Sequence, residues 1–319
     1  MRKKLALAVL LIMGLTLSMA NVTALAGNYP NRPIELIVPW APGGGSDTLM
    51  RLVTKHIRQY LGVPMQVINI PGVSGTIGLQ QFSHKRPDGY SLAMIHDGLL
   101  TSHYTGVTPL NWDSFVPITQ LTASPQFLAV NSKSPWKTLD DFLSYAKDHP
   151  GEVTFGVTML GSAHVMGKEL EEAAGVKFRY VGYEGTGQRV QALMGGHIDA
   201  IVVDKASSEQ YVKAGYFRLL ALGHDERLPQ FPDVPTFAEL GYPDLVWSVP
   251  RGIVAPKGTP ESVLKVLDDA FAKLAKDPKF REEVENLGSL VVYRDRQTYT
   301  EYLKKRDEVI KAIAPKLQQ

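Results

Sequence analysis

Short apolar runs alternate with segments of helical hydrophobic spacing in the first part of the chain. Residues 34–38 form an apolar run bounded by prolines, and apolar residues then recur at helical spacing from Leu49 to Leu61. Further short runs lie at 65–70 and 91–95, and a helical pattern over 76–84 separates them. Strands that alternate with helices through short loops predict a parallel sheet covered by helices on both faces.

The same alternation starts again further along the chain. Thr138 is expected to cap a helix, and Thr259 followed by Pro260 marks the start of another. The stretch 223–250 is rich in proline and charge and is expected to return the chain to the first unit. The apolar runs of this second set lie at 127–130, 152–157, 178–181, 200–204 and 217–222. These patterns predict two α/β lobes, one formed by residues 27–124 and 247–319 and the other by residues 125–246.

The first 26 residues have the features of a signal peptide. Arg2, Lys3 and Lys4 precede an apolar run, and Ala24-Leu25-Ala26 is a small-residue cleavage signal. An uncleaved anchor helix is the alternative, but the apolar run is short for a membrane span. We expect cleavage near Ala26 and export of the mature protein. Without a cysteine to carry a lipid, a retained receptor is expected in a periplasm.

Composition and charge exclude several functions. Apolar residues make up 44% of the chain and charged residues 21%, as in ordinary globular proteins. Without the signal peptide, 31 basic residues face 32 acidic ones, so a nucleic-acid partner is not expected. The chain has no cysteine, which excludes disulfides and thiolate chemistry. Its eight histidines show no metal-ligand spacing, so neither a metal nor a cofactor is expected.

Two loops that follow a strand and open a helix are candidate anion sites. Helix N-termini have unpaired N–H groups and a partial positive charge, and glycine lets a ligand approach the backbone. Neither loop contains Lys or Arg, so backbone amides and hydroxyls are expected to hold a carboxylate there. The alternative is that both loops are ordinary turns. The candidate residues are Gly43, Gly44, Ser46 and Asp47 in the first loop, and Thr158, Gly161 and Ser162 in the second.

Other motifs exclude common enzyme classes. The glycine-rich turn at 182–187 lacks the dinucleotide fingerprint, and no P-loop or G-x-S-x-G motif occurs. Asp204 follows a buried strand, where ligands of open α/β sheets bind. A secreted α/β enzyme with Ser46 or Ser162 as nucleophile remains the alternative from another class, although no nucleophile motif supports it.

Several segments in order along the chain are similar to those of the tripartite tricarboxylate transporter receptors, the Bug or TctC-type solute-binding proteins. Early examples are Gly43-Gly44-Gly45-Ser46-Asp47 and Pro71-Gly72-Val73-Ser74-Gly75. Later examples are Gly195-Gly196-His197-Ile198-Asp199 and Ala255-Pro256-Lys257-Gly258-Thr259-Pro260. The resemblance covers essentially the whole mature chain. Each motif is weak alone, but their order and spacing are specific.

The resemblance implies a type II periplasmic binding fold, in which two doubly wound lobes joined by two crossings enclose a ligand cleft. It also implies capture of a small organic carboxylate and delivery to the membrane permease subunits of such a transporter. A receptor that signals to a membrane sensor is the alternative, and a monomer is expected. By position, the resemblance places the first ligand-binding loop at residues 40–47, including Trp40, and the second at residues 158–164, including His164. Tyr183 and Asp204 are expected as further cleft residues.

Three departures from the family pattern bear on the ligand. Glu184 stands where the family commonly has Lys or Arg, and Asp97 lies in a loop that usually has small polar residues. Arg251 replaces an aromatic residue of the family pattern and is expected to face the cleft and pair with a distal carboxylate of the ligand, because Arg suits two-point carboxylate recognition. A salt bridge at the surface or between the lobes is the alternative role for Arg251.

Overall fold

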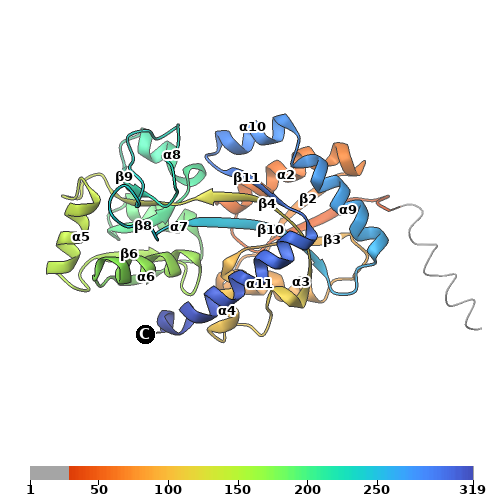
Figure 1. Cartoon of the computed structure of the whole chain (residues 1–319), viewed down its shortest axis with the longest axis horizontal. Helices are drawn as coiled ribbons and strands as arrows, with labels where there is room; N and C mark the ends of the chain where they lie inside the picture. Colours follow the sequence, from red (N-terminus) through yellow and green to blue (C-terminus); the bar gives the residue numbers. More distant parts are fainter. Residues whose placement is uncertain (1–28, 319) are drawn as a thin grey trace, which may run out of the picture.

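The computed structural model describes residues 29–318 as two α/β lobes side by side (Figure 1). The predicted signal peptide therefore lies outside the described residues. The predicted two-lobed architecture is confirmed, because the strands form two separate sheets. The elements up to the end of the first crossing strand are β1 (Ile34–Val38), α2 (Gly45–Leu61), β2 (Met65–Asn69), η1 (Val73–Gly75), α3 (Thr76–Ser83), β3 (Ser91–Ile95), α4 (Asp97–Tyr104), η2 (Trp112–Ser114) and β4 (Phe115–Pro125).

The second lobe is a continuous stretch of chain, after which the chain returns to the first. Its elements are β5 (Phe127–Asn131), α5 (Leu139–Asp148), β6 (Thr154–Val157), α6 (Ser162–Ala174), β7 (Arg179–Gly182), α7 (Thr186–Met194), β8 (Ala200–Val203), α8 (Lys205–Lys213) and β9 (Phe217–Leu222). The return consists of β10 (Ser248–Pro256), α9 (Glu261–Leu274), α10 (Pro278–Asn286), β11 (Leu290–Arg294), α11 (Arg296–Ile313) and η3 (Ala314–Gln318).

The first lobe has a six-stranded sheet in the order β11-β4-β10-β3-β1-β2. Strands β1, β2 and β3 are parallel, whereas β10 and β11 are antiparallel to their neighbours. The second lobe has a five-stranded sheet in the order β7-β6-β8-β5-β9, with β5 antiparallel to both of its neighbours. In each sheet the parallel strands point their carboxyl ends toward the space between the lobes, where ligands of such sheets bind.

Two long antiparallel strands join the lobes. β4 and β10 pair from Ser248 with Pro125 to Pro256 with Phe115, and they run from one lobe toward the other in Figure 1. Their pairing is irregular between Arg251 and Gly252. Just beyond this pair, the Gln126 amide donates to the Trp247 carbonyl at 3.0 Å, so both crossings leave the first sheet together.

The C-terminal helices return to the first lobe, but the last turn reaches the second. α9 and α10 pack on α2, and α11 packs on α4 and β4. η3 then contacts both α4 and α6, and Lys316 forms an ion pair with Glu172 at 2.9 Å. The end of the described chain is therefore a third bridge between the lobes, visible beside α4 and α6 in Figure 1.

Local signals predicted one helix start correctly and another wrongly. Thr138 caps α5 as predicted, in a capping box with Asp141. Thr259 does not cap α9: Pro260 occupies the N-cap, and the Thr259 hydroxyl donates to the Pro256 carbonyl instead. The stretch 223–247 follows β9, and its Phe237, Leu245 and Trp247 pack into the core of the second lobe.

Candidate functional site

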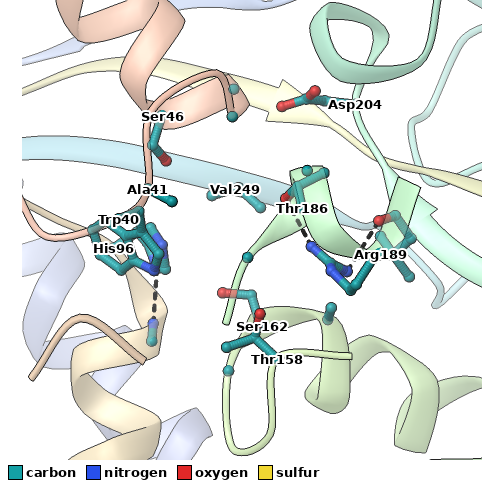
Figure 2. Close-up of a pocket in the computed structure, with 18 of the residues that line it drawn as sticks. Trp40, Ala41, Ser46, His96, Thr158, Ser162, Thr186, Arg189, Asp204 and Val249 are labelled. Carbon is teal, nitrogen blue, oxygen red and sulfur yellow. Dashed lines mark hydrogen bonds between the residues drawn. The ribbon is translucent and has the colours of Figure 1, made fainter. Parts of the chain in front are cut away.

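A cavity of about 330 Å³ lies between the lobes at the carboxyl ends of the parallel strands. Five connections from a strand to a helix line it: β1–α2, β3–α4, β6–α6, β7–α7 and β8–α8. Figure 2 shows Trp40, Ser46 and His96 on one side of the cavity and Ser162 and Arg189 on the other. Because each lobe supplies one face, a ligand here would touch both lobes at once.

Three helices point uncapped N-termini at this cavity. The N-cap residues of α2, α6 and α7 are Gly44, Gly161 and Gly185, and none of these ends has a side-chain cap. All three glycines line the cavity. By contrast, α5, α10 and α11 are capped by Thr138, Asp277 and Asp295. The first N–H groups of a helix need acceptors, so these three ends favour an anion in the cavity.

Asp47 shapes the β1–α2 loop from behind. Its Oδ2 accepts hydrogen bonds from the Gly43 amide and from Arg51, both at 3.0 Å, while its Oδ1 accepts one from Asn69. Burial would raise the pKa of Asp47, but the hydrogen bonds from Arg51, Gly43 and Asn69 bring it below its usual value. Gly43 has a φ of +81°, which a side chain would strain. Gly43 and Asp47 thus hold the loop but do not line the cavity.

Trp40 and His96 form an aromatic wall. Their rings stack with centroids 3.8 Å apart and planes 23° apart. His96 Nδ1 accepts the Gly98 amide at 2.9 Å and so caps α4. Burial, together with the charge of Arg251, lowers the pKa of His96 to about 3, so the imidazole is neutral at physiological pH.

The β6–α6 loop is a tight turn that places hydroxyls in the cavity. The Gly161 amide donates to the Thr158 carbonyl at 2.9 Å, and Leu160 has a φ of +58°. Behind it, His164 Nδ1 accepts the Leu160 amide at 3.2 Å, and burial lowers the pKa of His164 to about 4. Ser162 Oγ is buried and has no hydrogen-bond partner among the described residues. A hydroxyl in this state is available to a ligand.

Arg251 connects the two faces of the cavity. Its Nη2 lies 3.4 Å from Asp204 Oδ2, and its Nε donates to Ser46 Oγ at 3.1 Å. Its Nη1 donates to Ser124 Oγ and to the Val249 carbonyl. Asp204 caps α8 through the Ser207 amide. Every nitrogen of Arg251 therefore has a protein acceptor, and its contact with Asp204 is a salt bridge between the lobes.

Arg189 is a second buried guanidinium at the cavity. It extends from α7 and donates from Nη1 to the Val202 carbonyl at 3.2 Å and from Nη2 to Thr186 Oγ1 at 2.8 Å (Figure 2). Its Nε has no partner, and no carboxylate of the described chain lies within 4.0 Å of it. Burial lowers the pKa of Arg189 to about 10, while the charge of Asp204 partly offsets this, so the side chain remains charged at neutral pH.

Most residues expected at the site meet at this cavity, and some do not. Those that line it are Trp40, Gly44, Ser46, Thr158, Gly161, Ser162, Asp204 and Arg251. Gly43, Asp47 and His164 lie behind the loops. Asp97 turns away, and its Oδ2 lies 2.7 Å from Arg306 of α11. Tyr183 lines a neighbouring cavity of about 450 Å³.

Sequence reasoning missed several residues that line the cavity. Ser74 lies in η1, Gln126 joins β4 to β5, Thr186 is the first residue of α7, and His96 lies between β3 and α4. Arg189 is the most informative omission. It shares the buried face of α7 with Val190 and Leu193, so a charged residue at an inward helical position was the available signal.

Within 29–318, no group of three or more His, Asp or Glu side chains is arranged to hold a metal ion. No helix in that part of the chain is both long and apolar enough to cross a bilayer.

Comparison with known proteins identifies the family. The model of the TctC family, described as tripartite tricarboxylate transporter family receptor, matches residues 49–318. A UPF0065 protein of Cupriavidus necator is 35% identical over 298 residues, which cover 92% of this chain and 90% of the relative.

Solved structures show the same fold. A periplasmic transporter structure has 34% identity and a TM-score of 0.85, covering 90% of this chain and 98% of its own. MatC from Rhodopseudomonas palustris with bound malate has 27% identity and a TM-score of 0.82, covering 90% and 100%. These likenesses confirm the type II periplasmic binding fold. The chain belongs to the tripartite tricarboxylate transporter receptor family, and it is a solute-binding receptor.

Proposed function

We propose that this protein captures a small organic carboxylate in the cleft between its lobes and delivers it to the membrane permease of a tripartite tricarboxylate transporter. The observation that carries the proposal is the convergence of three uncapped helix N-termini, of α2, α6 and α7, on one cavity. Each end is worth roughly 0.3–1 kcal/mol to an anion, and up to ~2 kcal/mol when partly buried. The malate bound by MatC supports the same ligand class.

The contacts proposed for the carboxylate are backbone amides and hydroxyls. Gly44, Gly161 and Gly185 leave the helix ends open to a ligand, and Ser162 Oγ lacks a protein partner in the described chain. Trp40 supplies an apolar wall beside them. Tyr183, Asp97, Asp47 and His164 are not included in this contact set, because they lie outside the cavity.

Ligand capture is proposed to close the lobes about the crossings at β4 and β10, with residues 27–124 and 247–319 as one body and 125–246 as the other. Each face of the cavity comes from a different body, so a ligand contacting both stabilises the closed arrangement. The bridge formed by η3 is expected to restrict the direction of this motion.

The proposed setting is the periplasm, after removal of residues 1–26, with the receptor acting as a monomer without a cofactor. An osmotic-shock fraction should contain the mature protein, and size-exclusion chromatography should give a monomer. We also propose that the protein is not an enzyme. Ser46 Oγ accepts a hydrogen bond from Arg251, and among the described residues it donates to no histidine that could take its proton, which supports a binding role over a nucleophile.

The test is to identify the anion and measure its binding. Native protein from the periplasm is analysed by mass spectrometry for a co-purified acid, and the identified acid is titrated calorimetrically into refolded, ligand-free protein. A carboxylate that binds without being converted supports the proposal. Recovery of a neutral or cationic solute in the cleft, or turnover of the acid, would contradict it.

A further inference from the structure

We infer that the ligand carries two carboxylates, one held at the helix N-termini and the other paired with Arg189, which makes Arg189 the residue that selects a dianion. The inference rests on the proposed function and specifies the chemistry of the same cleft. Its starting point is the state of the buried cations in the structure.

Three cationic side chains are at least nine-tenths buried in the described chain: Arg189, Lys205 and Arg251, with exposed fractions of 6%, 4% and 3%. Lys205 pairs with Glu209 at 3.1 Å, and Arg251 pairs with Asp204. Arg189 alone among these three has no carboxylate partner. A buried charge is costly unless a counter-charge and hydrogen bonds compensate it, so Arg189 lacks the partner that the other two have.

Arg189 lines the cavity and has N–H donors that no group of the described chain uses. A guanidinium has five N–H groups, of which Arg189 uses one on Nη1 and one on Nη2 for neutral oxygens of Val202 and Thr186. Nε has no partner among residues 29–318. These two bonds fix the planar group at the wall of the cavity (Figure 2), and a planar fork suits two-point binding of a carboxylate.

The charge at the cavity fits two negative groups rather than one. Each helix N-terminus is equivalent to roughly +0.5 of a charge, so three such ends and one unpaired arginine together provide more than two positive charges. Asp204 adds one negative charge near Arg189, but the charge of Arg251, with which it is paired, balances it in this sum. Glu184 lines the cavity but is solvent-exposed, so its charge is screened.

A purely structural role is the competing explanation. In that case Arg189 would simply fasten α7 to β8 through the Val202 carbonyl. Arg218 offers a matched control, because it belongs to the same lobe and donates only to the carbonyls of Trp136 and Ser132. It does not line the cavity. Arg218→Gln therefore tests loss of a carbonyl-bonded guanidinium without a change in the cleft.

The experiment compares diacids with their own monoamides. Ligand-free protein is titrated calorimetrically with succinate, L-malate and glutarate, and the best binder is then compared with its monoamide. We expect the wild type and Arg218→Gln to prefer the diacid. We expect Arg189→Gln to bind the diacid about tenfold or more weakly, because hydrogen bonds to charged groups contribute roughly 1.5–3 kcal/mol, while its affinity for the monoamide changes little.

Each outcome separates the inference from the proposed function. If the acid recovered from the cleft is a monocarboxylate and no diacid binds the wild type, the inference is overturned and the proposed function stands; if no carboxylate of either kind binds, the proposed function itself is contradicted. If a diacid binds but the wild type does not distinguish it from the monoamide, or Arg189→Gln keeps the same preference, only the inference is overturned. Should Arg189→Gln fail to fold, Arg189→Lys decides: it keeps the charge but not the fork, and an unchanged diacid affinity would overturn the inference.

Discussion

Arg251 of β10 and Asp204 at the start of α8 form an ion pair across the cleft, with 3.4 Å between Nη2 and Oδ2, although they belong to different lobes. Both side chains are buried. The next residue, Lys205, also reaches the first lobe, where its ammonium donates to the Asn286 carbonyl at the end of α10. Two consecutive residues of the second lobe therefore hold the closed arrangement through charged contacts.

Breaking this buried pair is expected to be costly. Asp204→Asn keeps an N-cap for α8 but leaves Arg251 without a counter-charge, so we expect a loss of about 3–5 kcal/mol in the free energy of unfolding. Asp204→Asn combined with Arg251→Gln should lose less than the sum of the two single variants, as measured by urea unfolding. Asp88→Asn, at the exposed pair with Arg32, is the control and should cost less than ~1 kcal/mol. Additive losses at 204 and 251 would show that the pair is not coupled.

Gly45 is expected to be required for closure rather than for folding. A Cβ at this position would overlap Asp204 Oδ2 from the opposite lobe, whereas a Cβ at Gly44 would come no closer than 3.8 Å to the nearest atom, Ala41 O. We expect Gly45→Ala to hold the lobes apart and to raise the radius of gyration in small-angle scattering. Gly44→Ala should scatter like the wild type. Equal radii for all three proteins would contradict a steric role for Gly45.

His96 is expected to make the fold sensitive to acid. Its pKa is lowered to about 3 in the folded protein, so between about pH 6.5 and pH 3 the unfolded chain binds a proton that the folded one does not. The contribution of His96 to the free energy of unfolding should therefore be constant above pH 6.5. Below pH 6.5 the free energy of unfolding should fall by at most about 1.4 kcal/mol per pH unit. His96→Asn can still accept the Gly98 amide and should lose less stability between pH 7 and pH 5. Some loss of stability in acid should remain in His96→Asn, because the pKa of His164 is also lowered. If His96→Asn is as acid-sensitive as the wild type, the role of His96 is refuted.

The C-terminal bridge is expected to depend on packing rather than on charge. Leu317 is 5% exposed, while Lys316 and Glu172 form their ion pair with side chains that are 49% and 53% exposed. Leu317→Ala should cost about 2 kcal/mol or more in the free energy of unfolding, because it removes buried apolar volume. Lys316→Ala should cost less than ~1 kcal/mol. Chemical denaturation of both variants checks this, and the reverse order of losses would contradict it.

Local patterns predicted the parallel strands and most helices but not the strands that join the lobes. β4 contains Pro117 and Pro125, and its residues are buried on both faces, so it shows neither alternation nor a clean apolar run. β10 likewise contains Pro250 and Pro256. Prolines are tolerated here because the pairing of these strands is irregular and they end at turns. These strands depend on partners far away in the sequence, which a local pattern does not specify.

The cleft loops were predictable because glycine between a strand and a helix is a signal in the local sequence. The pairing partners of the charged side chains were not predictable. Asp97 was expected in the cleft, but it pairs with Arg306, 209 residues away. Arg251 was expected to face the cleft, and it does line the cavity, but its pairing with Asp204 depends on the lobes being closed. Such contacts join elements that only the tertiary fold brings together.

The three uncapped helix ends also have a consequence for the lifetime of the receptor. Their first N–H groups have no side-chain acceptor, and a bound anion can supply one. Bound solute therefore stabilises the folded receptor. A solute at a hundredfold excess over its Kd stabilises the folded state by about 2.7 kcal/mol, and the opened forms that proteases attack become correspondingly rarer. We therefore expect a cell growing on the solute to degrade this receptor more slowly, because the bound solute protects the receptor from proteolysis.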